Sequence, residues 1–167
     1  MKNEQGFSLV ELLIVVAIIA IIAAIAVPSL LTSRMAANEA SAIQGLRTIG
    51  SAEIAFAATN NQQFTEIADL ATQNFLDGRF STAGTDPING YTYVSGTVEV
   101  EGGTAFDHTL PNVFAVEAQP VQGLGRFTYG IGPDQVVRYQ GFQDPATAYP
   151  TGSDLGTPIG KGVAAAP

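Results

Sequence analysis

The sequence has no cysteine and only one histidine among its 167 residues. Without cysteine, a disulfide scaffold, a thiol nucleophile and a thiolate metal site are excluded. His108 has no second histidine or cysteine with which to hold a transition metal, and the acidic residues form no D-x-[DN]-x-[DN]-G calcium loop. We therefore predict neither a metal site nor a cofactor.

Positive charge is scarce too, because seven Lys and Arg face fifteen Asp and Glu, for a net charge of −8. A protein that binds the nucleic-acid backbone needs clustered cations, and none are visible. No hydroxyl lies at a plausible spacing from a catalytic base, and no Gly-rich phosphate-binding motif is present. The sequence thus predicts no specific nucleic-acid binding and no enzymatic activity.

What the chain does contain is one long apolar run near its N-terminus. Sixteen consecutive apolar residues extend from Leu12 to Val27, and the segment 7–31 provides twenty-five positions that suit a lipid environment. A membrane-spanning helix needs about 20 such residues. We predict a single-pass membrane helix over 7–31, followed from about Thr32 by a domain of ordinary soluble composition.

This run differs from a secretory signal peptide, in which cleavage follows an apolar stretch at a small-residue site. Here Ala26 is followed by Val27 and Pro28, so the far end offers no A-x-A site with a polar flank. The near end is preceded by a six-residue leader that ends in Gly6. If the chain is cleaved, the better position is after Gly6.

Glu11 is the one charged residue inside the apolar segment. A carboxylate there costs roughly 2.5 kcal/mol or more at the membrane centre and less near the interface. No Lys, Arg or His lies within a helical turn, but cleavage after Gly6 would place a free α-amino group on Phe7, one turn away. Two chains packed with a small axial stagger could then pair the α-amino group of one chain with the Glu11 carboxylate of the next. The alternative is that Glu11 simply faces water at the helix end.

The segment from Gly6 to Val16, GFSLVELLIVV, resembles the cleavage and N-methylation signature of type IV prepilins and type II secretion pseudopilins. The resemblance covers about the first thirty residues. It implies that a membrane prepilin peptidase cuts after Gly6 and methylates the new N-terminal Phe7. It also implies that Glu11 is the filament-assembly carboxylate.

Pro28 lacks a backbone N–H and would clash with the preceding helical turn, which costs about 3 kcal/mol in a helix interior. It either ends the membrane helix or is accommodated in a helix that continues. The family resemblance favours continuation, with a kinked stretch that can lose helicity in the filament.

Residues 32–60 have the spacing of an amphipathic helix. Gly45 and Gly50 indicate either close contact with a sheet or close approach of neighbouring helices. The expected apolar positions are Met35, Ile43, Leu46, Ile49, Ile54 and Phe56, with Arg34, Asn38, Glu39, Arg47 and Glu53 interleaved between them.

The remaining chain predicts a connecting region over 61–90, an antiparallel sheet over 91–140 and a loop or tail over 141–167. We expect a short helix at 66–74 and strands around 91–100, 114–118, 127–131 and 136–139, with a bulge or bend at Gly96 and a turn at 132–135. A sheet needs a second layer to bury one face, and the amphipathic helix can supply it. The predicted fold is α+β, a long N-terminal helix packed on three or four antiparallel strands, as in pilins.

Three functions remain open. The resemblance implies a structural subunit of a type IV pilus, polymerised through its N-terminal helix into a surface filament for adhesion, twitching motility or DNA uptake. Its partners would be copies of itself, the prepilin peptidase and the inner-membrane assembly machinery. A pseudopilin that forms a periplasmic fibre in type II secretion is the alternative. A third possibility, of a different class, is a membrane-anchored exported binding domain.

Overall fold

A single helix, α1, extends over 51 residues from Leu9 to Thr59. The computed structural model describes residues 7–98, 106–107, 112–141 and 157–158. Within the chain, residues 1–34 and 35–167 form two separate compact units. Gly6, His108 and Val100 lie outside the described residues.

The first unit consists of the N-terminal part of α1. The helix continues through Pro28, so this proline does not end it. In the turn that follows, the Thr32 and Ser33 hydroxyls each donate to the carbonyl oxygen of Ser29, both at 2.9 Å. The expectation of a continuous helix is therefore confirmed.

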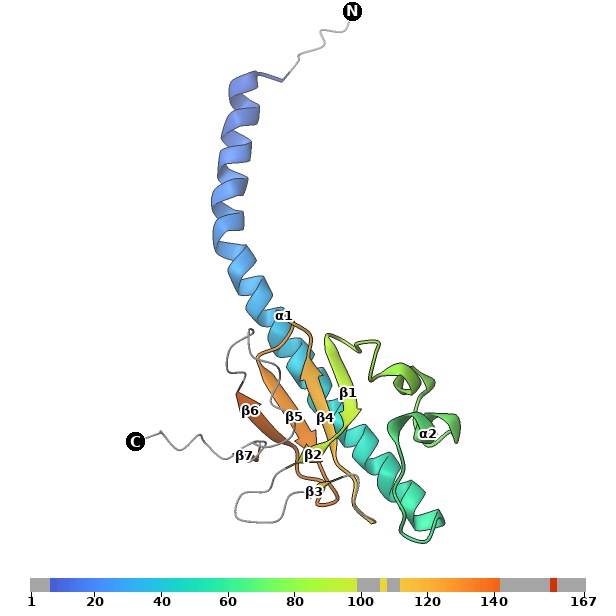
Figure 1. Ribbon diagram of the computed structural model, residues 1–167. Coiled ribbons are helices and arrows are strands. Elements are labelled where there is room, and N and C mark those ends of the chain that lie inside the picture. The colour runs from blue at the N-terminus through green and yellow to red at the C-terminus, as the bar shows by residue number, and fades with distance from the viewer. Residues whose placement is uncertain (1–6, 99–105, 108–111, 142–156, 159–167) are drawn as a thin grey trace, which may run out of the picture. The chain divides into compact units, whose positions relative to one another are not determined.

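The second unit contains an antiparallel sheet with the strand order β1-β4-β5-β6-β7. One row of side chains runs across it, in which Tyr93 pairs with Ala118, Ala118 with Tyr129, and Tyr129 with Tyr139. The later part of α1 lies along this sheet (Figure 1). The strands are β1 Tyr91–Ser95, β4 Val116–Pro120, β5 Phe127–Ile131, β6 Arg138–Gly141 and β7 Thr157–Pro158.

The core forms where this part of α1 meets the sheet. Leu46 and Ile49 of the helix and Ile131 of β5 are fully buried and belong to one apolar cluster. A Cβ atom on Gly45 would collide with the Tyr93 hydroxyl, and one on Gly50 would lie 2.7 Å from Gln135 Oε1. Both glycines therefore allow close contact with the sheet side, as the first of the two interpretations predicted. The α+β prediction is confirmed.

The connection from helix to sheet contains two short helices. The first, α2, spans Ile67–Thr72, slightly shorter than the predicted 66–74. The second, η1, is a 3-10 helix at Gly78–Thr82 that the sequence analysis did not predict. Its start is capped by Asp77, whose carboxylate accepts the N–H of Arg79 at 2.9 Å.

The first predicted strand ends in the main sheet at Ser95. After Gly96, where a bulge or bend was expected, Thr97–Val98 form β2, which pairs with β3 (Phe106–Asp107) in a separate sheet. The Gly96 N–H donates to the carbonyl of Ala115, and a Cβ on Gly96 would lie 2.8 Å from a Glu117 carboxylate oxygen. Periodicity alone cannot show either contact.

Smaller differences concern strand ends. The last of the four predicted strands begins at Arg138 rather than at residue 136, and Thr157–Pro158 in the expected tail pair with it. The predicted turn is present, because the Gln135 N–H donates to the Gly132 carbonyl at 3.0 Å.

Candidate functional site

The start of α1 places Glu11 against the backbone one turn earlier. Ser8 precedes the first helical residue, Leu9, and its N–H donates to Glu11 Oε2 at 2.9 Å. The first four N–H groups of a helix have no partner within it, and a glutamate at the third helical position commonly accepts from the residue before the helix. Glu11 therefore acts as half of a capping box.

The sequence offers no cationic side chain within a helical turn of Glu11, and the partner in the structure is a backbone amide. The signal was present as the S-x-x-E spacing from Ser8 to Glu11, which marks helix starts. The hydrogen bond uses one carboxylate oxygen, and Oε1 accepts none from the described residues.

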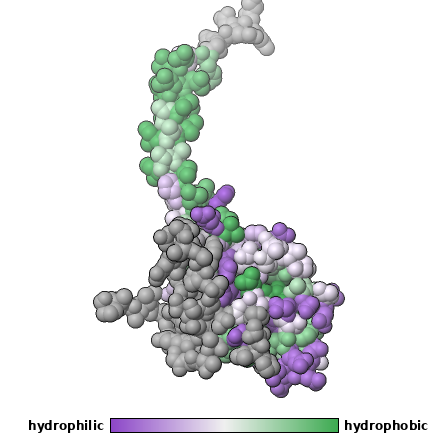
Figure 2. All heavy atoms as spheres, viewed as in Figure 1, coloured by the Kyte–Doolittle hydropathy of each residue, from purple (hydrophilic) through white to green (hydrophobic). Residues whose placement is uncertain are grey.

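Around this carboxylate the helix is apolar on every side and open to its surroundings. Phe7 is 87% exposed, and the large apolar side chains from Leu9 to Leu31 are each about half exposed or more. Figure 2 shows the apolar residues along this part of the helix. The helix is long and apolar enough to cross a membrane, and nothing within the described residues covers its most apolar window.

A comparison with known protein families decides what this segment is. Residues 1–27 match the family model of the prokaryotic N-terminal methylation motif. The chain carries a prepilin signature. This motif supports a member of the type IV pilin or pseudopilin family, and it covers residues 1–6 and most of the apolar segment 7–31. No curated protein matches the chain.

In the second unit, some residues of α1 sort differently from the expected polar and apolar faces. Glu39 and Glu53, predicted among the polar positions, are 7% and 1% exposed. Ile54, predicted to be buried, is 44% exposed. The helix face toward the sheet therefore carries the predicted Leu46, Ile49 and Phe56, together with small residues and the two carboxylates.

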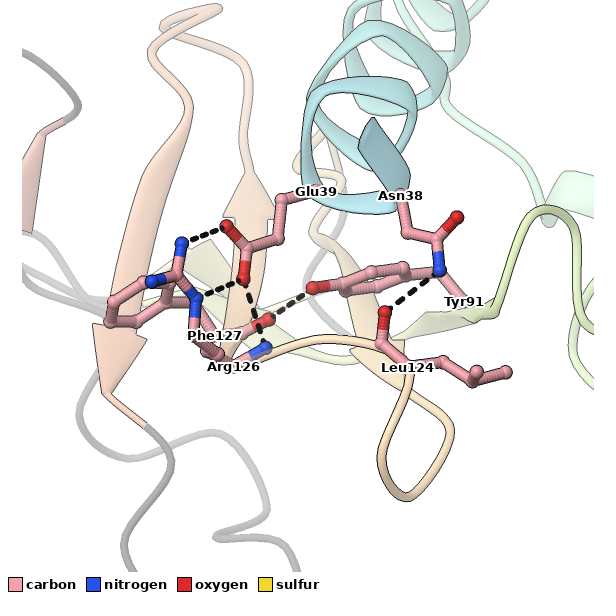
Figure 3. A network of polar contacts seen from close by, with 6 residues as sticks. All are labelled: Asn38, Glu39, Tyr91, Leu124, Arg126 and Phe127. Carbon is pink, nitrogen blue, oxygen red and sulfur yellow. Dashed lines mark hydrogen bonds and ion pairs between the residues drawn. The ribbon is translucent and has the colours of Figure 1, made fainter. Parts of the chain in front are cut away.

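Glu39 is buried because Arg126 binds it. The Arg126 backbone N–H and Nε donate to Glu39 Oε1 at 3.0 and 2.9 Å, and Nη2 donates to Oε2 at 2.9 Å (Figure 3). A guanidinium that binds both oxygens of a carboxylate is among the stronger polar contacts in proteins. This pair joins α1 to the turn before β5 across 87 positions of sequence.

Two neighbouring hydrogen bonds strengthen the same junction (Figure 3). Asn38 Nδ2 donates to the Leu124 carbonyl, and the Tyr91 hydroxyl donates to the Phe127 carbonyl, both at 2.9 Å. Burial raises the pKa of Tyr91 far above its usual value, so the hydroxyl stays protonated and keeps donating. We assign this network to positioning the helix on the sheet.

Glu53 has no such cation. Its Oε2 accepts the Thr65 N–H at 3.3 Å, and its Oε1 has no hydrogen-bond partner among the described residues. Burial raises the pKa of Glu53 to about 7, with a smaller opposing effect from the Thr65 N–H and a further increase from the nearby Glu66. Sequence reasoning missed this residue because nothing local marks a buried carboxylate.

The described residues contain no group of three or more His, Cys, Asp or Glu side chains arranged to hold a metal ion.

Proposed function

We propose that the chain is a structural subunit of a type IV pilus that polymerises through its N-terminal helix into a surface filament for adhesion, twitching motility or DNA uptake. The observation that carries the proposal is the exposed, all-round apolar helix from Leu9 to Leu31 with a single carboxylate at its start, inside a prepilin signature.

A helix that is apolar on every side needs an apolar environment. Before assembly, the inner membrane supplies it, since 23 residues at 1.5 Å each span about 34 Å, close to the hydrocarbon thickness of about 30 Å. After assembly, the same helices of neighbouring copies supply it. The exposed surface thus serves as a membrane anchor first and as the filament interior later.

Processing would connect the two states. A prepilin peptidase and methyltransferase would cut between Gly6 and Phe7 and methylate the new α-amino group. Oε1 of Glu11 would then accept a hydrogen bond from the α-amino group of Phe7 in an adjacent copy, while Oε2 keeps its hydrogen bond from the Ser8 N–H. Because an unpaired charge in an apolar bundle is strongly unfavourable, this pair would select one axial stagger between subunits.

Pro28 would give the assembled helix a weak point. It cannot donate the N–H that would bond the Ala24 carbonyl, so the helix holds one hydrogen bond fewer there. We propose that this stretch kinks or loses helicity in the filament and allows it to lengthen under load.

The methylation motif fits a pseudopilin of type II secretion equally well. Electron microscopy of sheared surface filaments, with peptide mapping, separates the possibilities. A pilus subunit forms long abundant fibres that contain this chain and begin at methylated Phe7. Fibres confined to the periplasm would indicate the pseudopilin, and an intact Met1 on a membrane-bound monomer would indicate the simple anchored domain.

A further inference from the structure

The second unit contains a pocket between the end of α1, the segment that follows it and the start of β4. Its volume is about 440 Å³, within the range of small-molecule sites. We call it the Glu53 pocket. Its lining includes Glu53, Phe64, Thr65, Glu66, Ser95 and Phe114.

Glu53 is the feature of this pocket that a purely structural role does not explain. It is 1% exposed, yet no Lys or Arg side chain of the described residues pairs with it, and its Oε1 lacks any hydrogen-bond partner among them. A buried acceptor without a partner is rare in folded proteins and is costly to maintain. By contrast, the other buried glutamate of α1, Glu39, accepts three hydrogen bonds from Arg126.

The walls indicate what kind of group would complete the site. A second carboxylate, Glu66, stands at the exposed rim, where it accepts the Ser95 hydroxyl. The rings of Phe64 and Phe114 lie 5.0 Å apart at an angle of 58°. Carboxylates favour a cation, and aromatic faces attract organic cations and pack against alkyl groups.

We propose that the Glu53 pocket binds a small primary alkylammonium ion, with its ammonium group donating to the Glu53 carboxylate and its alkyl group against Phe64 and Phe114. A hard metal ion fits the pocket less well, since Ca²⁺ takes six to eight oxygen ligands and the described lining offers two carboxylates. This site is separate from the filament interface of the proposed function and does not depend on it.

The proposal has a characteristic pH dependence. The ammonium ion requires an ionised Glu53, whose pKa in the free protein is about 7. Glu66 is the other titratable group among the described lining residues. Affinity should therefore be about tenfold higher at pH 8 than at pH 6, because the ionised fraction of Glu53 rises by that factor.

The test is a titration of the full-length chain in detergent micelles with n-butylammonium chloride, followed by amide NMR. The Thr65 amide reports directly, because it donates to Glu53. We expect a saturable shift of this signal that n-butanol and sodium butyrate do not produce. Calcium chloride is titrated in parallel, and saturation by calcium alone would replace the amine site by a metal site and overturn the proposal.

Three variants complete the experiment. Glu53→Gln keeps the shape and removes the charge, and it should weaken binding by about ten- to a hundredfold and abolish its pH dependence. Glu66→Gln, at the exposed rim, should have a smaller effect. Asp86→Asn removes an exposed carboxylate that does not line the pocket and should change nothing. Equal binding by Glu53→Gln, or no saturable shift in the unmodified chain, would overturn the proposal.

Discussion

The two parts of helix α1 share one backbone conformation and differ in what surrounds them. From Leu9 to Leu31 its large apolar side chains are exposed, whereas from Met35 to Thr59 one face is buried against the sheet. The three glutamates of the helix follow this division. Glu11 bonds to a backbone amide one turn earlier, Glu39 to an arginine far along the sequence, and Glu53 to a single amide beside the Glu53 pocket.

Helix formation and helix burial are therefore separate properties. The same continuous element can present an unsatisfied apolar surface in one part and a completed core in the other. The first part is available for partners, and the second positions a domain.

The largest expected effect is on assembly and concerns Glu11. Replacing it with valine should leave the chain membrane-inserted and cleaved after Gly6 while abolishing filaments, because the subunit loses its charge partner. Filaments are counted by electron microscopy, and processing is followed by mass spectrometry of the N-terminus. Normal filaments from this variant would remove the proposed pairing.

A second variant, Glu11→Gln, separates the charge from the helix cap. Glutamine can still accept the Ser8 N–H, as in other capping boxes, but carries no charge. We expect it to assemble as poorly as the valine variant. If it assembles normally, capping is the role of Glu11 and the amine pairing is wrong.

The next prediction compares two leucines, one in each part of the helix. Leu46→Ala should lower the free energy of unfolding of the second unit by about 2–5 kcal/mol, since Leu46 is fully buried. Leu13→Ala, in the exposed part, should leave it unchanged. Thermal unfolding in detergent, followed by near-ultraviolet circular dichroism of the tyrosines, measures the stability of both variants. Equal losses in Leu46→Ala and Leu13→Ala would contradict the difference in burial between the two parts of the helix.

Glu53 should make the stability of the second unit depend on pH. Because its folded-state pKa is raised to about 7, the folded state binds the proton more tightly than the unfolded state does. Stability is therefore highest below the unfolded pKa of about 4.5 and falls, by up to about 3 kcal/mol, as pH rises through 7. Comparing unfolding at pH 5 and pH 8 tests this.

The matched controls for this pH dependence are Glu53→Gln and Glu66→Gln. The first should abolish the decline between pH 5 and pH 8, and the second should preserve most of it, because Glu66 is exposed. A decline that persists in Glu53→Gln would assign it to another group.

The smallest expected effect separates an ion pair whose carboxylate is buried from one in which both side chains are exposed. Arg126→Ala leaves Glu39 buried without its cation and should cost about 2–3 kcal/mol of unfolding free energy. Arg79→Ala breaks a contact with Asp77 at 3.8 Å in which both side chains are mostly exposed, and it should cost less than about 1 kcal/mol. Similar losses in both variants would show that the Glu39 contact is weaker than its geometry indicates.

Sequence reasoning succeeded where the signal is local. The apolar run, the short helix near 67–72, the strand at 127–131 and the turn at 132–135 all follow from patterns within a few residues. It did not show that the strand of the main sheet ends at Ser95, and it failed at Glu39 and Glu53, which a polar-face assignment placed in solvent.

The sequence alone shows the prepilin signature, the apolar helix and its one carboxylate. Lipid solubility depends on composition, and helix capping depends on spacings of three or four residues, so both are visible without the fold. Only the tertiary structure decided which glutamates are buried, what each one bonds to and where a pocket remains. Those properties depend on contacts between residues up to 87 positions apart, and a buried carboxylate is costly where such a contact is incomplete.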